Sequence, residues 1–314
     1  MPRALRIEYP GAVYHVMNRG NQRWDIFRDD TDRRRFLATL WEACAKTGWQ
    51  VHAYCLMRNH FHLVCETPSA NLVAGMKWLL GVYTKRFNIR HQTCGHLFAG
   101  RYQALVVDGS GNGYLRTVCD YVHLNPVRAR RLRRDAPLTA FVWSSYADYL
   151  RPPAQRPGWL RTDRLLGEQG VPQDSPAGRR ELARRMEERR RQETEADYEQ
   201  LRRGGCLGDE EFRQELLTCG QPAGASHYGG ERRERDEEKA RRLVAEQLQR
   251  LGWPAAELAK RRKGDAEKVA LARRLRAETT MSLKWIAGEL HMGNWTYVSN
   301  LLSQKAHKSV NSED

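Results

Sequence analysis

The stretch that decides the fold is Met57-Arg58-Asn59-His60-Phe61-His62-Leu63-Val64-Cys65, a mostly apolar run that predicts a buried strand. Strand side chains alternate in direction, so His60 and His62 should project from the same face, with α-carbons roughly 6–7 Å apart. Two imidazoles at that spacing can share one metal ion. Ten histidines in 314 residues give roughly 0.3 such pairs by chance, so the motif needs support from elsewhere in the chain.

Residues 119–131 supply that support, because they place a tyrosine and an amide four residues apart, just before a basic cluster. On a helix, Tyr121 and Asn125 would lie one above the other on a single face. Pro126 predicts that the regular helix ends or kinks near this point, since proline lacks an N–H and disfavours helical geometry in the residue before it.

Further short motifs follow in a fixed order over residues 1 to about 165. They are Tyr14-His15-Val16, Arg19-Gly20-Asn21, Asn59-His60-Phe61-His62-Leu63, Gly100-Arg101-Tyr102, Tyr121-Val122-His123-Leu124-Asn125-Pro126-Val127-Arg128-Ala129 and Trp143-Ser144-Ser145-Tyr146. Taken together, these motifs resemble the single-tyrosine HUH transposases, specifically the REP-associated tyrosine transposases, which are relatives of insertion-sequence transposases. The resemblance implies a ferredoxin-like fold and an enzyme that nicks and rejoins single-stranded DNA.

The resemblance also implies roles for individual residues. His60 and His62 would be metal ligands, Asn125 would supply a third ligand oxygen, and Tyr121 would be the nucleophile that forms a 5′-phosphotyrosine. The implied substrate is single-stranded or hairpin DNA at repetitive extragenic palindromes. The chain departs from the family pattern at two positions: Arg58 stands where family members usually carry proline, and Asn125 stands where insertion-sequence relatives often have glutamine.

The proposed ligands indicate which metal the site would take. A phenol ordinarily has a pKa of about 10, so a tyrosine nucleophile benefits from an electrophilic partner at neutral pH. Two imidazoles and an amide oxygen favour Mg²⁺ or Mn²⁺. A zinc knuckle of Cys55, His60, His62 and Cys65 is the competing interpretation, but it needs a broken strand, because Cys65 would fall on the opposite face. Glu66 shares the histidine face, either as an extra ligand or as an exposed strand-end carboxylate.

The charge of the chain points to nucleic acid as its partner. It carries 53 Lys and Arg against 38 Asp and Glu, a net charge of +15, and phosphate contacts dominate non-specific affinity for DNA. The arginines that follow the tyrosine segment are expected to grip the DNA backbone: Arg128, Arg130, Arg131, Arg133 and Arg134. No apolar run approaches the ~18 residues of a membrane span and no secretory leader opens the chain, so we expect a cytoplasmic protein without a membrane partner. A monomer and a homodimer both remain open.

Hydrophobic periodicity predicts the order of elements in the first half of the chain. Short apolar runs indicate strands at 11–19, 49–57, 60–66 and 102–107, and helical spacing indicates helices at 30–46, from about 72 and from about 112. The order βαββαβα is typical of an α+β fold with helices over one antiparallel, ferredoxin-like sheet.

The rest of the chain divides by composition. We expect a catalytic domain at 1–165, a charged helical and glycine-rich linker at 166–234, and an all-helical domain at 235–314. The Arg- and Glu-rich run 176–203 predicts a solvent-exposed helix face on which Arg and Glu side chains four residues apart form ion pairs.

The helical end of the chain has the pattern of a helix-turn-helix, with helices at 282–290 and 294–304 around His291-Met292-Gly293. Thr296 and Asn300 are expected to face outward and read duplex DNA, with Lys260 and Arg261 contacting phosphates. A generic helical hairpin is the alternative.

Two functions of different classes follow. The first is a metal-dependent, tyrosine-linked single-strand DNA endonuclease and transposase. The second is a catalytically inactive DNA-binding regulatory protein that works through its helix-turn-helix. An intact set of His60, His62, Tyr121 and Asn125 favours the first.

Overall fold

The structure, a computed structural model, describes residues 7–133, 135–171, 173–194, 196–199, 201, 205–219 and 230–303. The backbone divides into two compact units, the first within residues 1–221 and the second mostly within residues 222–314. Across the described residues, no helix combines the length and the apolar character needed to cross a membrane.

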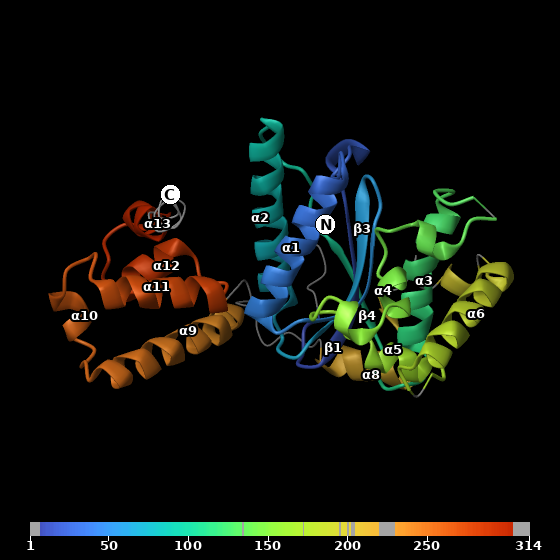
Figure 1. The fold of residues 1–314 in the computed structure, drawn as a ribbon. Coiled ribbons are helices and arrows are strands. Elements are labelled where there is room, and N and C mark those ends of the chain that lie inside the picture. Colours follow the sequence, from blue (N-terminus) through green and yellow to red (C-terminus); the bar gives the residue numbers. More distant parts are fainter. Residues whose placement is uncertain are drawn as a thin grey trace. The chain divides into compact units, whose positions relative to one another are not determined.

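A five-stranded sheet with the order β2-β3-β1-β4-β5 forms the centre of the first unit (Figure 1). The elements that build it, in chain order, are β1 (Ala12–Arg19), α1 (Asp30–Thr47), β2 (Gln50–Leu56), β3 (His60–Thr67), α2 (Leu72–His91), β4 (Gln103–Val107) and α3 (Tyr114–Arg128). The first four strands pair antiparallel with their neighbours, which confirms the ferredoxin-like α+β fold predicted from the sequence. Strand β5 (Cys206–Leu207) pairs parallel to β4 and was not predicted, because two residues show no alternation.

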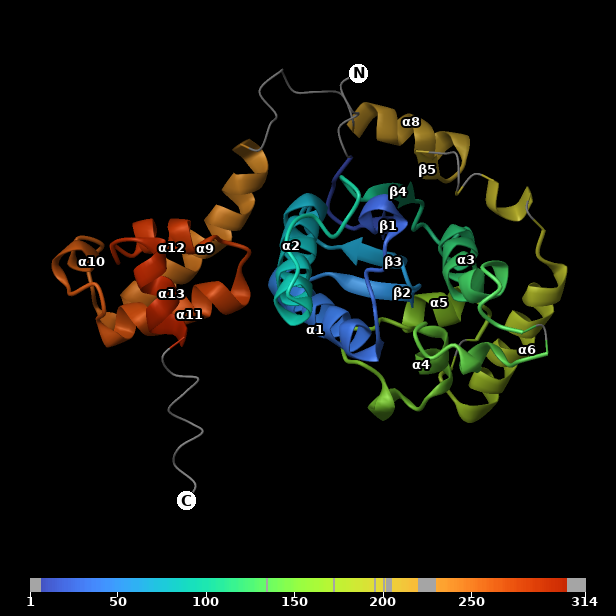
Figure 2. The same cartoon turned by 90° about the horizontal axis from the view of Figure 1, so that it is seen from above.

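The sheet separates two layers of helices. On one face, Phe61 of β3 lies with its ring centroid 4.9 Å from that of Phe36 in α1, and Phe36 lies 5.0 Å from Tyr83 in α2. Helix α3 covers the other face (Figure 2). Because His60 and His62 alternate with Phe61 along β3, they lie on the face covered by α3.

Helix α1 begins and ends at residues whose side chains favour helix termini. The Asp29 carboxylate accepts a hydrogen bond from the Asp32 amide at 3.0 Å, which satisfies one of the free N–H groups of the first turn. At the other end Gly48 has a φ of 74°, and its amide donates to the Cys44 carbonyl at 2.8 Å. Glycine adopts this left-handed conformation without a Cβ penalty.

The segment after residue 145 packs onto the first unit. The short helix η2 (Leu138–Ala140) precedes this segment. The elements of the segment are α4 (Tyr146–Leu150), η3 (Pro153–Gln155), α5 (Asp163–Glu168), α6 (Pro176–Gln192), η4 (Ala196–Tyr198) and α8 (Glu210–Cys219). The sequence predicted a linker over 166–234, whereas Leu166, Leu182 and Met186 are buried in the same core as the sheet. Val171, Leu207 and Leu216 of the same segment are buried there too, so apolar side chains spaced along an otherwise charged segment pack it against the sheet domain. The solvated face predicted for 176–203 is present, since Arg184 and Glu188 pair at 3.2 Å.

The second unit is all-helical, as predicted. Its helices are α9 (Gly230–Leu251), α10 (Glu257–Lys260), α11 (Ala266–Glu278), α12 (Leu283–Glu289) and α13 (Trp295–Ser303). Helix α12 begins at Ser282, whose hydroxyl accepts from the Trp285 amide, and α13 begins at Asn294, whose side chain accepts from the Tyr297 amide. Ile286, Leu290, Met292 and Val298 are buried between the helices. Residue 304, where the sequence predicted the last helix to end, lies outside the described residues.

A buried lysine holds the turn between α12 and α13 to the segment before α11. Lys268 of α11 has no exposed surface, and its Nζ donates to the carbonyls of Leu258 and His291, each at 3.0 Å. A third carbonyl, that of Arg261, lies at 3.5 Å. Burial lowers the pKa of Lys268. The ammonium group therefore satisfies backbone oxygens at the end of α10 and in the turn between α12 and α13, where helix termini leave carbonyls free.

Candidate active site

The histidine pair lies at the start of β3, on the sheet face covered by α3. The ring centroids of His60 and His62 are 5.2 Å apart and the rings are nearly perpendicular, at 84°. In the strand register, His62 lies opposite Met17 of β1 and Cys55 of β2, so it has a strand on each side. The His62 side chain is only 2% exposed, whereas that of His60 is half-buried. His60 is therefore the member of the pair that an incoming substrate can reach.

Helix α3 brings the tyrosine and the amide to these histidines. The Tyr121 ring centroid lies 5.7 Å from that of His62, and the Asn125 amide nitrogen lies 3.1 Å from His62 Nε2. The helix passes through Pro126 and ends at Arg128, two residues beyond the position where the sequence predicted an end or a kink. Because the regular helix extends past Asn125, Tyr121 and Asn125 keep the four-residue spacing that places them on one face.

His15 of β1 joins this group, although sequence analysis did not select it as a site residue. Its Nε2 lies 2.9 Å from His62 Nδ1, and the two rings stack with centroids 5.2 Å apart and an interplanar angle of 12°. The edge of Tyr121 meets the His15 ring at 5.6 Å. His15 belongs to the Tyr14-His15-Val16 motif, which was the one signal in the sequence that could have identified it.

The hydrogen bonds around His62 define which nitrogen carries its proton. The Asn125 amide nitrogen can only donate, so His62 Nε2 accepts with its lone pair. His62 Nδ1 then carries the proton and donates to His15 Nε2. His15 thus fixes the tautomer that points the basic Nε2 of His62 toward α3, as carboxylates and carbonyls do for metal-binding histidines.

The imidazoles of the site are neutral at physiological pH. Burial, with the Arg19 and Arg131 guanidinium groups acting in the same direction, lowers the pKa of His60 to about 4. Burial and then the neighbouring His15 and His60 rings lower the pKa of His62 well below its ordinary value. Burial and the Arg128 charge lower the pKa of His15 to about 4. Neutral imidazole is the form that binds a metal ion.

His60, His62 and the Asn125 amide oxygen are ligand atoms that suit a hard divalent ion. Among the described residues, no group of three or more His, Cys, Asp or Glu side chains is arranged to hold a metal, so a third protein ligand would be the Asn125 oxygen. The Asn125 amide nitrogen faces His62, and a side-chain hydrogen bond between Asn125 and His60 acts to raise the pKa of His60, so the amide group lies between the two imidazoles. The zinc knuckle is wrong, because Cys65 alternates with His62 onto the other face of β3, where it pairs with Tyr14.

Glu66 is engaged elsewhere and is no ligand in this arrangement. Its carboxylate lies 3.3 Å from His52 Nε2, 3.2 Å from Arg161 and 2.5 Å from Arg164. The hydrogen bond from His52 and the charge and hydrogen bond of Arg164 lower the pKa of Glu66 to about 2. Glu66 therefore anchors the residues that follow α4 to the end of β3.

The arginines after Tyr121 differ in what they contact. The Arg128 guanidinium lies 4.0 Å from the Tyr121 ring centroid and 4.7 Å from that of Tyr198, and it pairs with Glu193 at 3.1 Å. Sequence analysis expected Arg128 to grip the DNA backbone, whereas the structure places it against the proposed nucleophile.

Three other arginines of the run, Arg130, Arg131 and Arg133, are exposed. Arg130 and Arg131 lie just beyond the end of α3, and Arg133 pairs with Asp135 at 3.0 Å. Arg134 lies outside the described residues. In the second unit, Lys260, Thr296 and Asn300 are exposed.

Arg261, expected to contact phosphates, is committed within the second unit. It pairs with Glu257 at 3.1 Å and with Asp265 at 3.4 Å, and its guanidinium lies 3.7 Å from the Trp253 ring centroid. A phosphate contact would compete with these interactions.

The fold and the site define a class of protein: an α+β domain in which a strand-borne histidine pair faces a helix-borne tyrosine. Residues 9–125 match the family model of IS200-like transposases, which confirms the resemblance to insertion-sequence transposases. No curated protein matches the chain. A solved structure of a REP-associated tyrosine transposase bound to a REP hairpin is similar at 13% identity and a TM-score of 0.41, covering 52% of this chain and 93% of that chain.

Proposed function

We propose that the protein is a metal-dependent transposase that cleaves and rejoins single-stranded DNA through a 5′-phosphotyrosine at Tyr121. The observation that carries the proposal is the convergence of Tyr121 and Asn125 from α3 on His62 of β3, at 5.7 Å between ring centroids and 3.1 Å between polar atoms. The match of residues 9–125 to IS200-like transposases supports the same chemistry.

In the first step the Tyr121 oxygen attacks the scissile phosphorus, the P–O3′ bond breaks, and the released 3′-oxygen takes up a proton as the phenol loses one. The ester is conserved in the P–O bond to Tyr121, so a 3′-hydroxyl can later attack the same phosphorus and release the phenol. His60, His62 and the Asn125 oxygen would hold Mg²⁺ or Mn²⁺, which when bound polarises the phosphate.

The remaining contacts of the site fit this chemistry. The Arg128 guanidinium, 4.0 Å from the Tyr121 ring centroid, places a positive charge over the ring of the proposed nucleophile. The exposed Arg130, Arg131 and Arg133 lie past the end of the same helix, where they can contact the phosphates of a bound strand.

Two further parts of the proposal concern the DNA. By resemblance to the REP-associated transposases, the substrate would be a palindromic hairpin. The second unit would read duplex DNA with the exposed face of α13, which carries Thr296 and Asn300. The exposed Lys260 would add phosphate contacts.

The test is covalent trapping. Wild-type protein and a labelled single-stranded hairpin DNA are incubated with Mn²⁺ or Mg²⁺, and a denaturant-resistant adduct is measured on a gel. Tyr121→Phe should form no adduct while binding the DNA as before, because the ring keeps its packing and loses only the attacking oxygen. Chelation of the wild type, or His60→Ala, should also suppress the adduct.

Tyr198→Phe is the matched control, because Tyr198 packs against Tyr121 with ring centroids 5.2 Å apart. It should form adduct at the wild-type level. An undiminished adduct in Tyr121→Phe would show that another residue is the nucleophile. Absence of adduct in every sample, with hairpin binding retained, would favour the inactive regulatory protein instead.

A further inference from the structure

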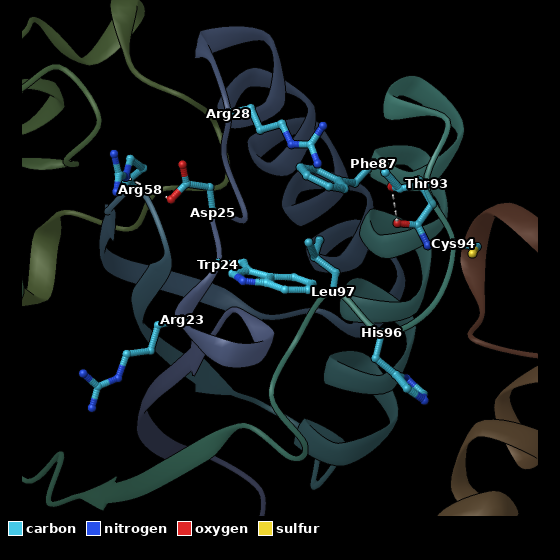
Figure 3. A pocket seen from close by; sticks show the side chains of 11 residues that line it. Arg23, Trp24, Asp25, Arg28, Arg58, Phe87, Thr93, Cys94, His96 and Leu97 are labelled. Carbon is cyan, nitrogen blue, oxygen red and sulfur yellow. Dashed lines mark hydrogen bonds and ion pairs between the residues drawn. The ribbon is translucent and has the colours of Figure 1, made fainter.

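A cavity of about 510 Å³ lies in the first unit, lined by residues that the proposed chemistry does not use. Its volume is within the range of roughly 300–1,000 Å³ that small-ligand sites occupy. The lining residues are Arg23, Trp24, Asp25, Arg28, Arg58, Phe87, Asn88, Thr93, Cys94, His96 and Leu97 (Figure 3). All of them come from the segments around η1 (Asn21–Arg23), the β2–β3 turn and the end of α2.

The lining combines an open aromatic surface with excess positive charge. The Trp24 side chain is 64% exposed, an unusual state for the largest apolar side chain, and Figure 3 shows it beside Leu97 at the centre of the cavity. Three arginines against one aspartate give the lining a net positive charge, and Asp25 pairs with Arg58 at 2.9 Å. An exposed ring with guanidinium groups around it is the combination with which proteins bind unpaired nucleotides.

The backbone before Trp24 forms a tight turn that fixes where the Trp24 main chain lies. Gln22 and Arg23 have φ angles of 51° and 63°, a conformation that side-chain-bearing residues rarely adopt. A Cβ at Gly20 would lie 2.0 Å from the Trp24 carbonyl oxygen, so only glycine permits this turn. The turn closes through a hydrogen bond from the Trp24 amide to the Asn21 carbonyl at 2.9 Å.

Asn59 connects this turn to the active site. Its carbonyl accepts from the Gly20 amide at 2.8 Å, and its side-chain nitrogen donates to the Arg23 carbonyl at 3.1 Å. Its side-chain oxygen lies 2.8 Å from His60 Nδ1. One residue therefore contacts both the loop that presents Trp24 and a ring of the histidine pair.

We propose that this cavity binds one unpaired nucleotide of the single-stranded DNA, with the base stacked on Trp24 and the adjoining phosphates bound by Arg23 and Arg58. The inference deepens the proposed function and rests on it. Stacking tolerates any base because each has a π-face, whereas an arginine pairs with a phosphate through two parallel hydrogen bonds. The cavity would fix where the strand lies relative to Tyr121 without specifying its sequence.

The test compares two DNA ligands with the full-length protein in the presence of a chelator, so that cleavage plays no part. One is a fluorescent hairpin with a single-stranded extension, and the other is the same hairpin with a blunt end. Trp24→Ala should weaken binding of the extended hairpin about tenfold, within the effect of losing one base–aromatic stack, and leave the blunt hairpin unchanged. Trp24→Phe should retain most of the affinity.

The control is Trp41→Ala on α1, because Trp41 is similarly exposed, at 60%, but does not line the cavity. It should bind both DNAs as the wild type does. A second measurement places 5-iodouracil at successive positions of the extension and maps ultraviolet cross-links by mass spectrometry. One position should cross-link to the peptide that contains Trp24.

The outcomes separate this proposal from the proposed function. The cavity proposal would be overturned if Trp24→Ala bound both DNAs with wild-type affinity, or if it lost the same affinity for both. Either result would leave the proposed role of Tyr121 in adduct formation untouched. If the wild type forms no adduct but Trp24→Ala still loses binding only on the extended hairpin, the cavity proposal is supported and the catalytic proposal fails.

Discussion

Replacement of His15 tests whether the ring behind His62 takes part in metal binding. His15 Nε2 lies 2.9 Å from His62 Nδ1, and its ring stacks on that of His62. His15→Leu replaces the imidazole by an apolar side chain of similar size and so removes the hydrogen-bond acceptor of His62. The buried N–H of His62 then has to find another acceptor or give up the tautomer in which Nε2 is basic.

The magnitude follows from the burial of the pair. A buried donor that loses its partner costs about 1–3 kcal/mol. Loss of the group that orients a metal-binding histidine typically lowers metal affinity 10- to 100-fold, which corresponds to a similar free energy. We therefore expect the Mn²⁺ concentration that half-saturates adduct formation to rise 10- to 100-fold in His15→Leu. The rate at saturating Mn²⁺ should fall much less.

The assay is adduct formation on hairpin DNA over a Mn²⁺ titration, with thermal unfolding measured in parallel. His15→Gln should partly restore the metal response, because its amide oxygen can accept the His62 proton. His123→Leu is the matched control: His123 is equally buried and bonds the Ser145 hydroxyl at 2.9 Å, away from the histidine pair. It should lose stability without any change in the Mn²⁺ midpoint. An unchanged midpoint in His15→Leu together with lower stability would refute the reasoning and leave His15 a packing residue.

Two further predictions concern Glu66 and the second unit. Because the folded protein holds the pKa of Glu66 at about 2, below its ordinary value of 4.5, the ionised carboxylate stabilises the fold above pH 4.5 and this contribution is lost as pH falls toward 2. Glu66→Gln should therefore be less stable than the wild type at pH 7, by at most roughly 3 kcal/mol. The difference in the free energy of unfolding, measured in urea, should narrow below pH 4.5. A difference that stays constant with pH would contradict the role of the ionised Glu66 carboxylate. Alanine at Thr296 and Asn300 should relax duplex sequence preference by about 1–3 kcal/mol per base contact in competition binding, and unaltered preference would assign α13 to packing.

The sequence predicted the first four strands and the helices around them well, because each of these strands is a short apolar run and each of these helices has apolar residues at helical spacing. Strand geometry alone places His60 and His62 on one face of β3. Helix geometry alone places Tyr121 and Asn125 on one face of α3. Such patterns need only the residues within one element, so one sequence is enough to reveal them.

The features that sequence analysis missed depend on contacts between elements. His15 meets His62 only because the β1–β3 register pairs Met17 with His62, and nothing in either strand alone specifies that register. Arg128 turns to Tyr121 because Glu193, 65 residues away along the chain, lies beside it. A run of arginines has the same appearance in sequence whether its members bind DNA or pair within the protein.

The buried Lys268 also allows the local opening of the second unit to be measured by covalent labelling. An amine-reactive reagent cannot reach an ammonium group with no exposed surface, so Lys268 reacts only while α11 is detached from the carbonyls of Leu258 and His291. Its modification rate, set beside that of the exposed Lys260, measures how often this unit opens. Followed with and without duplex DNA, that rate would show whether binding reduces the opening of the helix-turn-helix.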